Sequence, residues 1–312
     1  MTHSTSKQIN DHTPLAILLA LIASFFYAVM AVFVKMLVKE HVHIEIMVFF
    51  RFVVSFILLG LVFLIAQKGL KSLYTQQLSL HIFRSLFALL AILFYFLSLN
   101  HIPIVNAVLL STTYPLFIPI LALLFLRVET NYKVYVSLAL GFLGIILILR
   151  PEHSLLTQWS SLLALLSGFC IAVSMLSVRR LNRNNSLFAI LFYYYIFSTL
   201  ISGVWSIFDW KTPTVHQFLL LLAVGLCGTI YQAGLVIALK FAHARIVSSL
   251  MYTTIVFSGL IGWYLWHVIP DKMTLWGIII VCTGGILTII FQRPKATEGI
   301  EGYNVDIKRK AT

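Results

Sequence analysis

The chain has 312 residues, of which 60% are hydrophobic and 10% are charged, and its mean hydropathy is +0.98. Soluble domains are about half apolar and about a quarter charged, so this composition excludes a soluble globular protein and predicts a polytopic membrane protein. The formal net charge of +12 does not indicate a nucleic-acid partner, because no soluble stretch combines basic and aromatic residues into a binding surface.

Ten segments are long enough to be membrane spans, since a span needs about 20 apolar residues. The fifth is short, and the connections leave no room for an inserted soluble domain. A polar leader over residues 1–14 precedes the spans, and a polar tail over 293–312 is expected to be disordered. In chain order the spans are Leu15–Val34, Ile44–Ala66, Leu80–Leu99, Ile104–Leu126, Val134–Leu149, Leu155–Val178, Leu187–Phe208, Val215–Leu239, Ile246–Val268 and Met273–Phe291.

The chain carries one pattern twice. Leu19–Leu37 and Leu163–Leu181 align without a gap at an offset of 144 residues. Further along, Gly144 in the fifth span aligns with Gly284 in the tenth at an offset of 140. An internal duplication of a membrane chain is the architecture of many secondary transporters.

Five spans in each copy is an odd number, so the second copy must enter the membrane from the opposite side. We therefore predict an all-α membrane protein of ten transmembrane helices, arranged as two inverted five-helix repeats over residues 15–149 and 155–292. Such repeats can expose a central site to each side of the membrane in turn.

The positive charge is distributed unevenly between the two sides of the membrane. With the N-terminus in the cytoplasm, sixteen of the 22 Lys and Arg residues fall in cytoplasmic segments and five on the other side. This bias follows the positive-inside rule and predicts that both termini are cytoplasmic. The basic excess is thus explained by topology.

Acidic residues are absent from the middle of the predicted spans. Glu45 opens the second span and Glu129 follows the fourth. Because proton pumps usually bury a carboxylate in the membrane, proton coupling through such an acid is disfavoured.

Two arginines are embedded in spans. Arg51 lies about two turns into the second span and Arg84 about one turn into the third. A charge in the membrane costs at least about 2.5 kcal/mol, so each should face the bundle interior and bind something. Arg84 could instead reach lipid phosphates at the cytoplasmic face, and Arg51 could bond to backbone carbonyls or to Glu45. The functional alternative is that both attract an anionic group of a substrate.

Hydroxyl groups gather in the fourth and ninth spans. The fourth also contains Pro115 and Pro119, which kink a helix and free carbonyls that only protein or a watery cavity satisfies in lipid. These two patches, related by the repeat, predict a binding cavity, although hydroxyls also serve helix packing. The candidate residues are Arg51, Arg84, Tyr95, Ser111, Thr112, Tyr114, Tyr231, Gln232, Tyr252 and Thr253.

The sequence gives little indication of disulfide bonds, metal binding or catalysis. The three cysteines lie in spans at wide spacing and are interpreted as small apolar residues. His41 and His43 sit beside Glu40 and Glu45, but a solvated loop is favoured over a metal site, and neither a metal nor a cofactor is predicted. No nucleotide-binding loop or intramembrane protease motif occurs.

Several stretches resemble the EamA-like family of the drug/metabolite transporter superfamily, over about residues 15 to 292. His43-Ile-Glu45 leading to the FFRF run at 49–52 is similar to the family's entry to helix two, and His81 with Arg84 to the H-x-x-R opening of helix three. Tyr114-Pro115-Leu-Phe resembles the first-repeat pattern. The second half departs from it, because Ile255 replaces Pro115.

The resemblance implies a secondary carrier of small organic metabolites in the bacterial inner membrane, with helices three, four, eight and nine around a central cavity. Members include S-adenosylmethionine carriers. We expect a small polar or zwitterionic substrate, such as an amino acid, an S-adenosylmethionine-like solute or an organic anion, and surrounding lipid. The alternatives are a non-transporting membrane subunit and, less favoured, an intramembrane enzyme. The sequence leaves the oligomeric state open, a homodimer included.

Overall fold

The computed structural model describes residues 13–67, 69–126, 132–149, 155–182, 184–241, 247, 250–267 and 271–291. Secondary structure in these ranges is entirely helical, which confirms the predicted all-α class. The elements are α2 (Thr13–Lys39), α3 (Ile44–Ile65), η1 (Leu70–Leu73), α4 (Leu78–Ser98), α5 (Ile104–Ser111), α6 (Tyr114–Leu126), α7 (Tyr132–Leu149), α8 (Leu155–Leu181), α9 (Leu187–Ile207), α10 (Val215–Phe241), α12 (Thr253–Trp266) and α13 (Lys272–Phe291).

Six helices are long and apolar enough to cross a bilayer by themselves, namely α2, α3, α4, α8, α9 and α10. The segments predicted as spans four, five, nine and ten correspond to shorter apolar helices in the described part of the chain. Helices suit this composition because every backbone group of a helix is bonded within the segment, as a lipid environment demands. Apart from Thr13 and Pro14, the predicted leader and the predicted tail lie outside the described residues.

The fourth predicted span is interrupted, as its prolines suggested. Helix α5 ends at Ser111 and α6 begins at Tyr114, so Pro115 occupies the first turn of α6, where a missing N–H needs no partner. In the interruption, the Thr113 hydroxyl donates to the Leu110 carbonyl at 2.6 Å. Local side chains thereby satisfy carbonyls that a continuous helix would have bonded.

A second interruption was not expected from the sequence. Residue Tyr252 forms a turn immediately before α12, although no proline lies there. The N–H of Ile255 donates to the Tyr252 carbonyl at 3.1 Å, and the Thr253 hydroxyl donates to the Leu250 carbonyl at 2.6 Å. In its described part, the ninth predicted span is therefore interrupted at Tyr252, where hydroxyl and backbone hydrogen bonds form turns without a proline.

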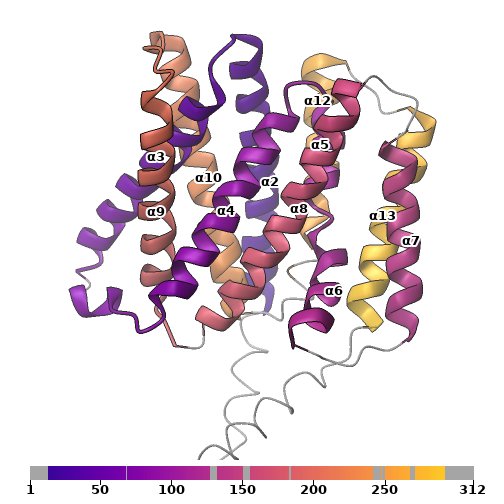
Figure 1. Cartoon of the computed structure of the whole chain (residues 1–312), viewed down its shortest axis with the longest axis horizontal. Helices are drawn as coiled ribbons and strands as arrows, with labels where there is room; N and C mark the ends of the chain where they lie inside the picture. The colour runs from indigo at the N-terminus through magenta and orange to yellow at the C-terminus, as the bar shows by residue number, and fades with distance from the viewer. Residues whose placement is uncertain are drawn as a thin grey trace, which may run out of the picture.

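The helices pack in pairs across the bundle. Helix α2 lies along α10, α4 along α8, α3 along α9, and α7 along α13. Figure 1 shows α3 and α9 at one end of the bundle, α7 and α13 at the other, and α2, α4, α8 and α10 between them. Many large apolar side chains face outward on these helices, Ile65, Ile207 and Tyr264 among them, which is the surface expected towards lipid.

The α7–α13 pair shows why small residues recur in this chain. A Cβ added to Gly284 of α13 would lie 2.5 Å from the backbone nitrogen of Gly141 in α7. Such a separation is too short for any side chain, so α13 approaches the α7 backbone this closely only because residue 284 is glycine. Close approach of this kind is how membrane helices gain packing energy without a hydrophobic driving force.

Candidate functional site

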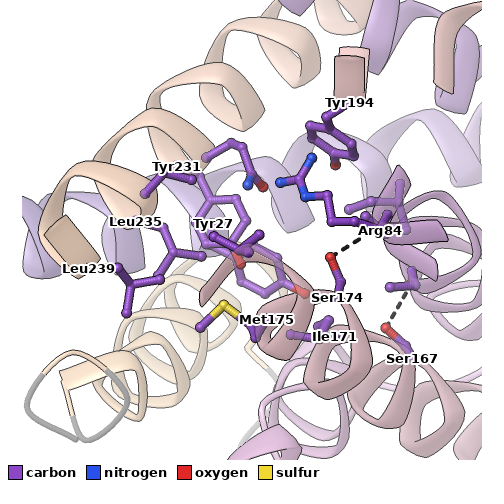
Figure 2. Close-up of a pocket in the computed structure, with 16 residues that line it drawn as sticks. Tyr27, Arg84, Ser167, Ile171, Ser174, Met175, Tyr194, Tyr231, Leu235 and Leu239 are labelled. Atoms are coloured by element: carbon purple, nitrogen blue, oxygen red, sulfur yellow. Dashed lines mark hydrogen bonds between the residues drawn. The ribbon is translucent and has the colours of Figure 1, made fainter. Parts of the chain in front are cut away.

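A small cavity lies within the bundle, between α2, α4, α8, α9 and α10. It offers about 40 Å³ to the centres of water molecules, which is room for about three waters. Its wall is polar on the side of α4 and α9 and apolar towards Leu235 and Leu239 of α10 (Figure 2). A metabolite would fit only after the surrounding helices move apart.

One face of α4 lines this cavity. Arg84, Ala88, Ala91 and Ile92 follow the helical spacing that places side chains on a common face. The Arg84 side chain is 1% exposed, and its guanidinium carbon lies 3.9 Å from the centroid of the Tyr194 ring of α9. Arg84 therefore turns into the bundle rather than towards the lipid surface.

Three tyrosines contact one another beside the cavity. Tyr27 of α2 stacks on Tyr95 of α4 with ring centroids 5.1 Å apart, and it meets the tilted ring of Tyr231 of α10 at 4.7 Å. Tyr27 and Tyr231 line the cavity, whereas Tyr95 lies behind Tyr27. The predicted residue Gln232 also lines it.

A second, smaller cavity adjoins the break between α5 and α6. It offers about 10 Å³, room for about one water. The predicted residues Ser111, Thr112, Tyr114 and Tyr231 line it, and three residues line both cavities, namely Tyr27, Ile171 and Tyr231. The helix break and the central cavity thus form one polar region.

The structure separates Arg51 from this region. Its guanidinium donates to the Gly228 carbonyl at 2.9 Å and to the Ser55 hydroxyl at 2.7 Å, and the side chain is fully buried. A Cβ on Gly228 would lie 2.0 Å from the Arg51 Nε. Arg51 therefore ties α3 to α10, and Glu45 is instead 3.2 Å from His43.

Two further candidates also lie apart from the cavities. The Tyr252 hydroxyl is buried against Gly285 of α13, where an added Cβ would lie 1.8 Å from it. Thr253 donates to the Leu250 carbonyl. The side chain of Pro119 is outside the described part of the structure.

Several lining residues were not among the sequence candidates. Tyr27 and Tyr194 supply aromatic walls, and Ser167 and Ser174 of α8 face α4. The Ser167 hydroxyl donates to the Ala91 carbonyl at 2.8 Å. The seven-residue spacing of the two serines, which puts them on one helix face, is a signal that could have identified them.

A group of potential metal ligands lies where α3 begins and α9 ends. Ligand atoms of His43, Glu45 and Asp209 all lie within 4.8 Å of one another. Asp209 is exposed and the other two are partly buried. The sequence had joined His43 and Glu45 but not Asp209. The absence of a resident metal stays a prediction.

A multi-helix membrane bundle with broken helices beside a polar cavity is the architecture of a small-molecule carrier. The comparisons with known proteins agree. The EamA-like transporter family matches residues 14–150 and again residues 158–290. The chain therefore belongs to the EamA-like transporter family, as the sequence motifs indicated.

Two named relatives illustrate the range of the family. The chain is 31% identical to the "Pseudopaline exporter CntI" of Pseudomonas aeruginosa (strain UCBPP-PA14) over 277 residues, which cover 88% of this chain and 93% of the relative. It is 28% identical to an "S-adenosylmethionine uptake transporter" of Rickettsia bellii, over 80% of this chain and 84% of the relative. A solved structure titled "Crystal structure of protein" shares the fold, with a TM-score of 0.66, 18% identity and coverage of 89% and 98%.

Proposed function

We propose that this transporter is a secondary carrier that moves a small polar organic metabolite by alternating access. The observation that carries the proposal is the cavity itself, which combines Arg84, Gln232 and the rings of Tyr27 and Tyr231 in the interior of a membrane bundle. Alternating access would open this cavity to one side of the membrane at a time. Neither ATP nor a bound cofactor enters the proposal.

The helix pairing supports an inverted repeat. We propose that α2 to α7 form one five-helix unit, with α5 and α6 counted as the two parts of one broken helix, and that α8 to α13 form its inverted copy. In this arrangement α2 corresponds to α8, α3 to α9, α4 to α10 and α7 to α13. Exchange of the two units then turns the α2–α10 pair into the α8–α4 pair and maps the α3–α9 and α7–α13 pairs onto themselves. All four of these pairs occur in the bundle. Two units of this kind would rock against each other around the shared cavity.

The two helix breaks support the same symmetry. The turn at Thr112 and the turn at Tyr252 are separated by the 140-residue offset of the second sequence match. Each break is packed by the first helix of the other unit. Gly168 of α8 lies against the Leu110 carbonyl, and the Ser24 hydroxyl of α2 lies 3.3 Å from the Leu250 carbonyl.

We propose that the substrate occupies both cavities. Arg84, Tyr231 and Gln232 would meet it in the larger one, and Ser111, Thr112 and Tyr114 in the smaller one, with Tyr95 positioning Tyr27. Arg51, Tyr252 and Thr253 would act indirectly, by holding helices together. S-adenosylmethionine and amino acids are candidate substrates because a relative is named for the former and because both are small and polar.

We propose the bacterial inner membrane as the location, with both termini in the cytoplasm, on the basis of the charge bias. An intramembrane hydrolase is less favoured, because Ser167 and Ser174 are hydrogen-bonded to α4 carbonyls. The buried His81 is 3.4 Å from Asn185. No serine–histidine pair is therefore formed among the described residues.

Uptake into proteoliposomes tests this proposal. Labelled amino acids, S-adenosylmethionine, nucleotides and dicarboxylates are offered with and without pH or sodium gradients, and empty liposomes serve as the control. The proposal predicts saturable uptake of at least one solute, lost when Tyr27 is replaced by Trp to fill the cavity. Folded protein that transports none of these classes would favour the non-transporting alternative.

A further inference from the structure

Arg84 is a buried cation with no counter-charge among the residues that the structure describes. Its Nε and Nη1 atoms are buried and have no hydrogen-bond partner in the described part of the structure. No Asp or Glu is buried among the described residues, and neither ion pair found there includes Arg84. An arginine in the membrane interior normally faces a partner or a substrate pathway.

Arg51 provides an internal comparison. It is equally buried, but a backbone carbonyl and a hydroxyl accept hydrogen bonds from both of its terminal nitrogens. Among the described residues, the fold therefore bonds both terminal nitrogens of Arg51 to neutral acceptors and leaves only its Nε without a partner. Arg84 instead faces a cavity with both Nε and Nη1 unpartnered. Tyr194 covers one face of the Arg84 guanidinium, so the N–H edge is the part left for a ligand (Figure 2).

We propose that Arg84 is the anion subsite of the carrier, and that the transported solute supplies the missing negative charge through a carboxylate or a comparable planar anionic group. The inference rests on the proposed function and deepens it by naming the substrate class. Guanidinium binds a carboxylate through two parallel N–H donors, and the Tyr194 ring holds the guanidinium plane in place. Gln232 adds a neutral donor and acceptor to the same cavity.

The remaining wall of the cavity indicates which chemical groups the other end of the solute should carry. Beyond Arg84, the wall is formed by the rings of Tyr27 and Tyr231 and by Met175, Leu235 and Leu239. These groups offer aromatic faces and apolar surface and no further charge. A solute with an anionic head and a planar, apolar or cationic remainder matches this wall, because tyrosine faces also attract cations.

Acetate and acetamide test the subsite directly, because they have the same shape and number of heavy atoms and differ in charge. Thermal unfolding of the purified full-length protein is followed in each solute, with sodium chloride, which carries no carboxylate, holding the ionic strength constant. We expect acetate to raise the unfolding temperature and acetamide to leave it unchanged. Arg84→Gln should weaken the acetate effect at least about tenfold, and Arg84→Lys should weaken it less.

If the Arg84→Gln variant does not fold, the variant Gln232→Glu provides a second test of the subsite. This variant places a carboxylate in the cavity with Arg84, so acetate protection should disappear from folded protein. Equal protection by acetate and acetamide, or acetate protection that survives either variant, would overturn the proposal. Acetate binding without uptake of any metabolite would contradict the proposed carrier function but support the anion subsite at Arg84. Uptake that is unchanged by Arg84→Gln would support the carrier function but contradict the anion subsite.

Discussion

At the scale of single residues, the two buried arginines have opposite roles. Arg51 bonds to a carbonyl and a hydroxyl that the fold supplies, and Arg84 faces the cavity. Burial of charge in a membrane is therefore not by itself evidence for a substrate contact. The difference lies in the neighbours, and it separates a structural cation from a functional one.

Replacing Arg51 by Gln is expected to destabilise the protein by about 2 kcal/mol or more. Hydrogen bonds to charged groups contribute about 1.5–3 kcal/mol, and the Gly228 carbonyl would lose its partner. Thermal unfolding in detergent measures the effect, with Arg180→Gln at an exposed position of α8 as the matched control. An Arg51 variant as stable as the control would show that these bonds contribute nothing.

Gly228→Ala should cost about 1–3 kcal/mol, the usual penalty of overpacking a buried site. The new methyl would occupy the position of the Arg51 Nε. Because the clash is with one side chain, the same substitution should cost less in an Arg51→Gln background, which a double-mutant cycle of unfolding free energies measures. Gly60→Ala, with nothing within 4 Å, is the control. Additive costs would mean that the two residues do not oppose each other.

At the scale of elements, the helix breaks are held by hydroxyls more than by proline. The turn at Tyr252 forms without a proline, whereas both breaks contain a threonine that donates to a carbonyl three residues earlier. We therefore expect Pro115→Ala to keep most of the uptake rate. Thr113→Val should lower the stability by about 1 kcal/mol and slow uptake. The opposite ranking of these variants would make the proline the cause of the break.

Helix α8 closes over the first break at Gly168. A Cβ there would lie 2.9 Å from the Leu110 carbonyl oxygen and 3.0 Å from that of Ser111. Backbone atoms cannot yield as a flexible side chain does, so Gly168→Ala should destabilise the protein by about 1–3 kcal/mol. Gly259→Ala in α12, whose nearest neighbour is 4.0 Å away, should be tolerated. Thermal unfolding compares the two, and equal stability would show that the helices separate freely at Gly168.

At the scale of the whole molecule, the sequence predicted the helices better than the contacts between them. Apolar length is a property of the segment alone, so ten helical regions could be located from it. Lipid and protein interior are both apolar, so the pattern of a span does not show which face is buried. For this reason the sequence did not predict that Tyr27, the single tyrosine of the first span, lines both cavities.

The contacts of individual candidates depended on distant parts of the chain. Arg84 and Gln232 reach the cavity, as expected of polar residues in spans. Arg51 does not, because its acceptor is the carbonyl of Gly228, 177 residues away. Every residue has a backbone carbonyl, so the residue type at 228 does not indicate this hydrogen bond. Tyr252 was chosen by its repeat relation to span four, but the glycine at 285 gives its ring a packing site instead.

The central claim is that the cavity opens to each side of the membrane in turn, and cysteine accessibility tests it most directly. Ser174→Cys is introduced into a variant whose Cys170, Cys227 and Cys282 are replaced, and a membrane-impermeant maleimide is added to one side of proteoliposomes of known orientation. Ser258→Cys, buried in α12 away from the cavities, is the control that should remain unlabelled. Labelling of Ser174→Cys from either side is the predicted result, and labelling from one side only, or from neither, would contradict alternating access.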